Sequence, residues 1–187
     1  MKKSLLLFAA LLLPVLIYLF LKSFGKNEFE VPVLYADTIH TSVPCYGQSY
    51  QLPYQVSDSV LRTFQWDSTS LFTVVVFEND SKDDQHERAI QINRVITEFK
   101  NEPVGIIHVL GTQTNVVSGS SDNVIQRVLM TDTSFQKIRN CVFLLNTGQD
   151  AVVIDKDRRI RGQYTLTKRE DADRMIMEEL NILLKRY

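Results

Sequence analysis

The chain has 187 residues, a formal net charge of −1 and a pI of about 6.3, with 44% hydrophobic and 23% charged residues. This composition is typical of one globular domain with an accessory segment, and it lacks the basic excess of nucleic-acid-binding proteins. The only cysteines, Cys45 and Cys141, are too few for a disulfide-dense scaffold or a cysteine-rich zinc module. We therefore expect no nucleic-acid partner.

The N-terminal segment 4–21 is apolar and uncharged. Its length is near the lower limit for a membrane-spanning helix, and the two lysines before it favour a cytoplasmic N-terminus. A cleaved signal peptide is the alternative, but it needs a shorter apolar core and a small-x-small cleavage site, and no A-x-A pattern is present. We predict an anchor in the cytoplasmic (inner) membrane that is single-pass, with the C-terminal domain on the periplasmic side. The predicted parts are residues 1–3 in the cytoplasm, 4–21 in the membrane, a tether at 22–30 and the domain at 31–187.

The first half of the domain predicts a strand–helix–strand unit after an extended start. Residues 24–68 contain three prolines and no sustained helical period. The following patterns predict a strand at 71–77 (LFTVVVF), a helix at 85–100 and a strand at 104–110 (VGIIHVL). The helix should turn Ala89, Ile92, Ile96 and Phe99 towards the core. Parallel strands joined by a right-handed crossover are expected.

The second half predicts helices and a hairpin. Short helices are expected at 122–130 and at 134–140, whereas the apolar run 142–145 fits either a strand or a helix end. Residues 151–155 and 160–165 flank a charged turn, which is typical of an antiparallel hairpin. Thr167 and Glu170 match a capping box for a last helix that runs to the C-terminus.

The predicted order of elements is β-α-β, a helical connection, a β-hairpin and a C-terminal helix. This order is that of a thioredoxin-like α/β fold with an N-terminal extension and a single transmembrane helix. A fold by itself does not define a function.

Three stretches resemble the Sco/SenC family, whose members are membrane-tethered thioredoxin-fold proteins linked to copper delivery for cytochrome c oxidase. They are FGKNEFEVPVLY at 24–35, DTIHTSVP at 37–44, and residues 152–184, which contain VVIDKDRRIRGQY and ADRMIMEELNILL. The resemblance implies a thioredoxin-like domain, a membrane anchor and a part in the assembly of respiratory complexes.

The chain departs from the family at the copper site. Members carry a C-x-x-x-C motif before the first core helix and a distal His before the hairpin. The equivalent positions here are Ser81, Gln85 and Thr147. Thiolates and imidazole suit Cu(I), and hydroxyl and amide oxygens do not replace them. We therefore expect a degenerate member without that metal site and without a cofactor.

The two cysteines allow two interpretations. Cys45 and Cys141 could form a disulfide in an oxidising compartment, or they could be separate, buried thiols. We favour two unpaired thiols, because sequence alone cannot place their Cα atoms within bonding reach. Neither belongs to a C-x-x-C pair, which argues against an oxidoreductase.

Other polar clusters have simpler explanations than a ligand site. The group Asp80, Asp83, Asp84, His86 and Glu87 could bind a divalent cation, but the dipole of a helix N-terminus explains it as well. Asp155-Lys156-Asp157 fits a charged hairpin turn. His108, within an apolar strand, fits a core histidine with one satisfied hydrogen bond.

We predict a non-catalytic binding or assembly module of the bacterial envelope, with an envelope or membrane protein as its partner. The alternative is a thiol-redox or metal-binding protein that uses Cys45, Cys141 or the acidic cluster at 80–87.

Overall fold

The computed structural model describes residues 12–19, 31–40, 45–79, 82–111 and 125–185. The chain divides into two compact units, residues 1–30 and residues 31–187, and each unit is described by itself.

The first unit contains the predicted membrane anchor. Residues 12–19 are helical and their side chains are exposed. The rest of the predicted anchor at 4–21, and the whole tether at 22–30, lie outside the described residues. Within the described part of the chain, no helix has the length and apolar character needed to cross a membrane. The anchor therefore stays a prediction.

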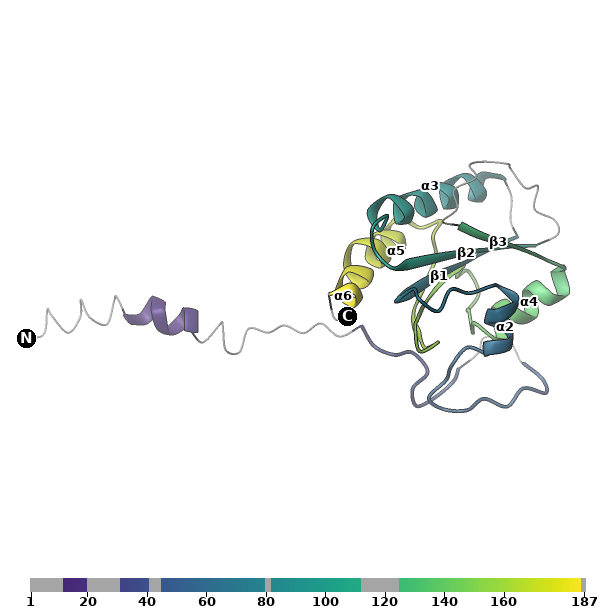
Figure 1. Ribbon diagram of the computed structural model, residues 1–187, viewed down its shortest axis with the longest axis horizontal. Helices are drawn as coiled ribbons and strands as arrows, with labels where there is room; N and C mark the ends of the chain where they lie inside the picture. The colour runs from purple at the N-terminus through teal and green to yellow at the C-terminus, as the bar shows by residue number, and fades with distance from the viewer. Residues whose placement is uncertain (1–11, 20–30, 41–44, 80–81, 112–124, 186–187) are drawn as a thin grey trace, which may run out of the picture. The chain divides into compact units, whose positions relative to one another are not determined.

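The second unit is an α/β domain built on one five-stranded sheet (Figure 1). The strands are β1 (Phe72–Glu78), β2 (Val104–Gly111), β3 (Ile125–Met130), β4 (Ala151–Asp155) and β5 (Ile160–Tyr164). The helices are α2 (Asp58–Thr63), α3 (Lys82–Glu98), α4 (Asp132–Cys141) and a C-terminal helix of three consecutive segments, α5 (Arg169–Asp173), π-helical η1 (Arg174–Glu179) and α6 (Leu180–Leu184).

The strand order β3-β2-β1-β4-β5 fixes the fold. β1, β2 and β3 are parallel, β4 is antiparallel to β1, and β5 is antiparallel to β4. Helix α3 joins β1 to β2, and the β4–β5 hairpin leads into the C-terminal helix. This arrangement confirms the predicted α/β class and its thioredoxin-like plan.

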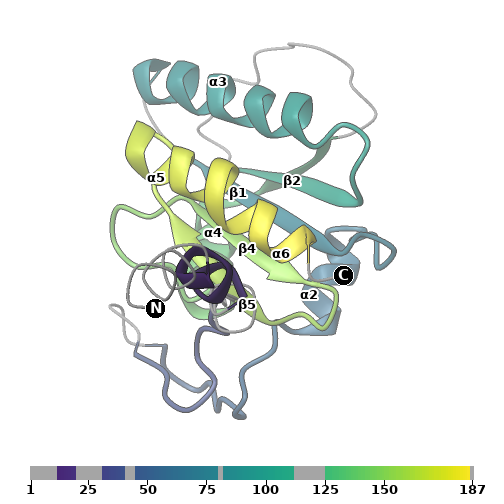
Figure 2. The ribbon, with the colours of Figure 1, turned by 90° about the vertical axis from the view of Figure 1, so that its left-hand side faces the viewer.

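The sheet separates two hydrophobic cores. On one face, α3 and the C-terminal helix pack through residues such as Ile92, Val95 and Ile176. On the other face, α2 and α4 pack through Leu61 and Phe135. Figure 2 shows the first pair of helices on one side of the sheet and the second pair on the other. β1 is buried along its whole length because it is central in the sheet and covered on both faces.

The predicted core face of α3 is partly wrong. Ile92 and Phe99 are buried as expected and Ile96 is partly buried, but Ala89 is exposed. The buried stripe instead begins at Arg88 and continues through Ile92 and Phe99. The hydrophobicity pattern missed this because a charged side chain occupies a core position.

The predicted helix at 122–130 is also wrong, because Ile125–Met130 is strand β3. Its side chains alternate from Val128 onwards between half-buried and exposed, which fits a strand at the sheet edge. Pairing with β2 satisfies backbone groups that an isolated short helix would leave open.

Three local predictions need further correction. Helix α2 lies inside the region expected to be extended. The C-terminal helix begins at Arg169 after Lys168, and no side chain caps it, so the Thr167–Glu170 capping box is wrong. The run 142–145 is not a strand: Val142 is the C-cap of α4, and the following residues are a buried irregular segment.

The start of the domain runs along the outer edge of β5. The Leu34 N–H donates to the Ile160 carbonyl at 2.8 Å, and Arg161 Nη2 donates to the Val31 carbonyl at 2.5 Å. Further on, the Val56 N–H donates to the carbonyl of Arg158 at 2.9 Å. These bonds explain why β5 is fully buried although it is an edge strand.

Candidate functional site

The resemblance aligns Ser81, Gln85 and Thr147 with copper ligands, and the structure does not show these three residues together. Ser81 lies outside the described residues. Gln85 is half-buried near the start of α3, and Thr147 is exposed in the loop before β4. Among the residues that the structure describes, no group of three His, Cys, Asp or Glu side chains could hold a metal ion.

A buried carboxylate–imidazole pair lies at the carboxyl end of the parallel strands. His108 Nε2 and Glu78 Oε2 are 2.7 Å apart, and their side chains are 13% and 10% exposed. The register pairs Glu78 with Leu110 and Val76 with His108, so the two side chains are diagonal neighbours on the face covered by α3. The prediction that His108 is a core histidine with a satisfied hydrogen bond is confirmed.

A buried ion pair lies beside this strand end. Arg88 Nε of α3 is 3.1 Å from Asp150 Oδ2, and the Arg88 side chain is only 1% exposed. Asp150 also accepts a hydrogen bond from the Leu166 N–H at 2.6 Å, and its backbone carbonyl accepts one from the Phe77 N–H at 2.7 Å. Asp150 therefore ties together β1, α3 and the chain after β5.

These four side chains form two pairs, Glu78 with His108 and Arg88 with Asp150, which hold neighbouring strands together and tie α3 to the chain before β4. Sequence reasoning missed Glu78, Arg88 and Asp150 as partners. The available signals were a charged residue at the end of a buried strand, Glu78, and a charged residue beside the apolar face of a helix, Arg88, because a buried charge needs a partner.

The structure joins Cys45 and Cys141 in a disulfide, with Cα atoms 5.6 Å apart and a sequence separation of 96. The interpretation as two unpaired thiols is therefore wrong. No sequence signal could bring together two residues so far apart, because the folding of α4 and of the N-terminal segment decides their distance.

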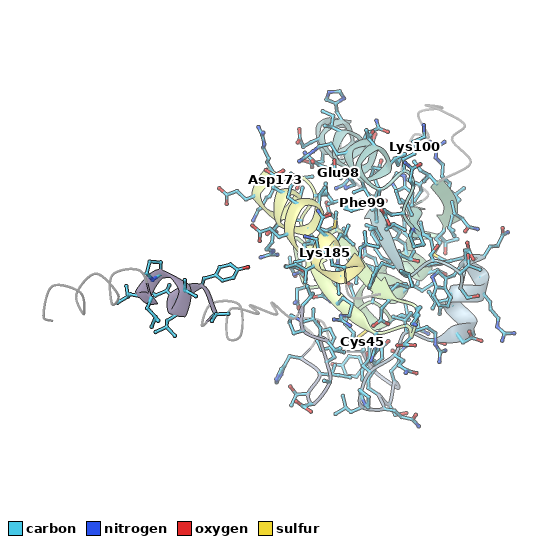
Figure 3. All side chains as sticks on the ribbon, turned by 60° about the vertical axis from the view of Figure 1, so that its left-hand side comes forward. Cys45, Glu98, Phe99, Lys100, Asp173 and Lys185 are labelled. Carbon is cyan, nitrogen blue, oxygen red and sulfur yellow. A yellow bond between two sulfur atoms is a disulfide. The ribbon has the colours of Figure 1, made fainter. Side chains whose placement is uncertain are left out.

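The disulfide lies on the face of the sheet opposite α3. Cys141 ends α4, which packs in the core beneath α2, whereas α3 packs in the other core. In Figure 3, Cys45 lies well away from Glu98, the last residue of α3, and from Phe99, which follows it. The two sulfurs therefore lie on the side of the sheet that α2 and α4 cover.

Two tyrosines complete this junction. Tyr50 Oη donates to the Cys141 carbonyl at 3.1 Å, and Tyr54 Oη donates to the Val142 carbonyl at 2.6 Å. The last carbonyls of a helix lack partners within the helix, so the two hydroxyls cap the C-terminus of α4. Burial is the main cause that raises the pKa of both phenols.

The acidic cluster at the start of α3 is only partly described. Asp80 and the side chain of Asp83 lie outside the described part of the chain. Asp84 and His86 are exposed, and Glu87 Oε1 accepts a hydrogen bond from Gln91 Nε2 at 2.8 Å. The described members thus give no support to a cation site.

The Asp155-Lys156-Asp157 segment is a hairpin turn, as predicted. Asp155 Oδ1 accepts the N–H groups of Asp157 and Arg159 at 3.0 and 2.9 Å. Its Oδ2 lies 2.9 Å from Arg159 Nε and 3.3 Å from Arg161 Nη1. The carboxylate is therefore a structural centre of the turn.

Comparisons with known proteins give matches among solved structures. No family model and no curated protein sequence matches the chain. The solved structure of BsSco, a member of the Sco family of cytochrome c oxidase assembly proteins in which a disulfide switch is identified, aligns with a TM-score of 0.46 and 9% identity. The alignment covers 62% of this chain and 82% of that chain. The order and the directions of the strands alone define the thioredoxin-like fold of this chain.

Proposed function

We propose that this chain is a membrane-tethered, non-catalytic thioredoxin-fold module that binds or assembles proteins of the bacterial envelope. The observation that carries the proposal is the disulfide. The chain has two cysteines, and both are bonded to each other on the face away from α3. No thiolate remains for a soft metal ion or for thiol exchange beside that helix.

The disulfide and the apolar segment 4–21 support a location outside the cytoplasm. Disulfides persist in oxidising compartments such as the periplasm and are rare in the cytosol. A tether of residues 22–30 would reach at most about 30 Å, so the domain would meet mainly proteins in or near the same membrane. Confinement of this kind raises the effective concentration of such partners.

The partner class follows from the resemblance to Sco/SenC proteins. We infer a contribution to respiratory-complex or envelope assembly through protein contacts and without copper transfer. Crosslinking of the full-length chain in intact cells should capture a membrane or envelope protein. A chain that yields no crosslinked partner in the membrane fraction would contradict the assembly role.

A copper titration tests the proposal that the chain has no high-affinity copper site. Full-length protein in detergent, titrated with Cu(I) against a chromophoric Cu(I) chelator in ascorbate, should retain no stoichiometric ion. The matched variant Ser81→Cys/Gln85→Cys/Thr147→His restores the ligand types of the family. If the scaffold is thioredoxin-like at this corner, that variant should gain tight binding of about one ion per chain. Tight binding by the natural chain would overturn the proposal and favour metal delivery.

A further inference from the structure

A polar cavity of about 470 Å³ opens at the amino ends of the three parallel strands. It is lined by the first residues of β2 and β3, by Thr73 of β1, and by the loop that precedes β1. It lies at the opposite end of the strands from the Glu78–His108 pair. Its volume is within the range of about 300–1,000 Å³ that is common for small-molecule sites.

Trp66 forms an ordered wall of this cavity. Its indole Nε1–H donates to Thr73 Oγ1 at 2.9 Å, and the ring packs against the core that contains α2 and α4. The half-buried ring also lines the cavity. An aromatic surface is thus fixed in place before any ligand arrives.

At Gly105, two hydroxyl groups pack closely against the floor of the cavity. A Cβ atom at this position would lie 3.1 Å from Ser70 Oγ and 3.2 Å from Thr73 Oγ1. The two hydroxyl groups therefore fill the space beside Gly105, and the absence of a side chain there lets them lie close to the strand backbone.

The charge on the described lining of the cavity is negative. Asp67 is exposed and lines the cavity, and none of the described lining residues is Lys, Arg or His. The Asp67 carboxylate is held by the Thr69 N–H at 2.8 Å and by Thr69 Oγ1 at 2.7 Å. The backbone hydrogen bond from Thr69 is the main cause that lowers the pKa of Asp67, so the group is anionic at neutral pH.

We propose that this cavity binds a small organic ammonium cation, with the charge between the Trp66 ring and the Asp67 carboxylate. Aromatic faces attract such cations, most strongly when the ring is an indole. Hydroxyl groups of Ser70 and Thr73 accept hydrogen bonds from a primary ammonium. The cation would be a free amine or the ethanolamine headgroup of a lipid, and this site is independent of the assembly role proposed above.

The only tryptophan of the chain gives a direct readout, because all indole fluorescence comes from Trp66. Full-length protein is titrated with ethanolamine, with choline, and with the uncharged tert-butyl analogue of choline. We expect a saturable change in fluorescence with an ammonium compound and none with the analogue. Added salt should weaken the response.

Asp67→Asn is the decisive variant. Asparagine keeps an oxygen that can accept the Thr69 hydrogen bonds, so the variant removes mainly the charge. We expect its affinity for the ammonium probe to fall about fivefold or more. Glu170→Gln removes an exposed charge from the C-terminal helix and should leave affinity unchanged. Equal affinities of Asp67→Asn and the natural chain would overturn the proposal.

Two further arms complete the test. In Trp66→Leu, which has no indole, a ligand-dependent rise in melting temperature should be lost. Vesicles of phosphatidylglycerol with and without phosphatidylethanolamine distinguish the source of the cation. A response to free ethanolamine assigns a soluble amine, and a response only to vesicles with phosphatidylethanolamine assigns a headgroup. No saturable response to any ammonium compound would refute the site.

Discussion

At the scale of single residues, buried charges are balanced by close partners. Asp155 is the clearest case, because its carboxylate is fully buried and serves two arginines and two backbone N–H groups. A buried charge that loses its partner is costly, whereas an exposed pair contributes little. The turn therefore contains one essential acid, Asp155, and one dispensable acid, Asp157.

We expect Asp155→Asn to lower the free energy of unfolding by about 3 kcal/mol, because it leaves Arg161 buried beside a neutral group. Asp157→Asn is the control on the same turn. Its side chain is 49% exposed, and its ion pair with Arg159 should contribute at most about 1 kcal/mol. Urea unfolding followed by circular dichroism measures both. Equal losses in the two variants would contradict this ranking.

Two buried tyrosines predict a fall in stability at alkaline pH. Burial raises the pKa of Tyr54 and of Tyr164, and Glu179, which accepts the hydrogen bond of Tyr164 Oη, raises the latter further. Phenols with a raised pKa in the folded state contribute stability below the unfolded value of about 10, and they lose it as pH rises above that value. Tyr54→Phe and Tyr164→Phe should each make the decline less steep.

Absorbance of phenolate during a pH titration, together with unfolding curves at several pH values, measures this effect. Tyr46→Phe changes an exposed ring that is 91% accessible and should leave the decline as it is. An identical decline in all three variants would show that the buried phenols are not its cause.

At the scale of elements, the junction between the N-terminal segment and α4 combines a covalent bond with two hydrogen bonds. The disulfide closes a loop with a sequence separation of 96, and the hydroxyls of Tyr50 and Tyr54 bond to the carbonyls at the end of α4. A cross-link over so long a loop stabilises mainly by restricting the unfolded chain.

Cys45→Ala/Cys141→Ala should therefore lower the free energy of unfolding by about 4.7 kcal/mol in the loop-closure account. The five strands should still form, because neither cysteine belongs to the sheet. Unfolding in urea and far-ultraviolet circular dichroism check both statements. A chain that loses its sheet signal would show that the disulfide is required for the fold itself.

At the scale of the whole molecule, full-length protein should fractionate with membranes and resist extraction by alkaline carbonate. Deletion of residues 1–22 should release it, because the apolar run is the proposed attachment. Recovery of the natural chain in the soluble fraction would contradict the anchor.

The natural chain should be unreactive towards thiol-alkylating reagents unless it is first reduced.

The local patterns predicted the central strands, helix α3 and the hairpin, because each has strong hydrophobic periodicity. They failed where long-range contacts decide the outcome. Arg88 is buried because Asp150, far along the chain, neutralises it. Residues 125–130 form a strand because the edge of β2 is there to pair with them.

In the candidate site, too, some features could be predicted from the sequence and others could not. The absence of cysteine at positions 81 and 85 and of histidine at position 147 is visible in the sequence, since it depends only on residue identity. The bond between Cys45 and Cys141 and the pair of Glu78 and His108 depend on the packing of distant segments. The cavity beside Trp66 likewise requires β1, β2 and the preceding loop to meet.

The position of the disulfide has a mechanical consequence. A domain held by its N-terminus feels any pulling force first at Val31, beside the outer edge of β5. Such a force would break the bonds made by residues 31–40, one after another. At Cys45 the load would pass through the two sulfur atoms into the end of α4, so the peeling would stop there.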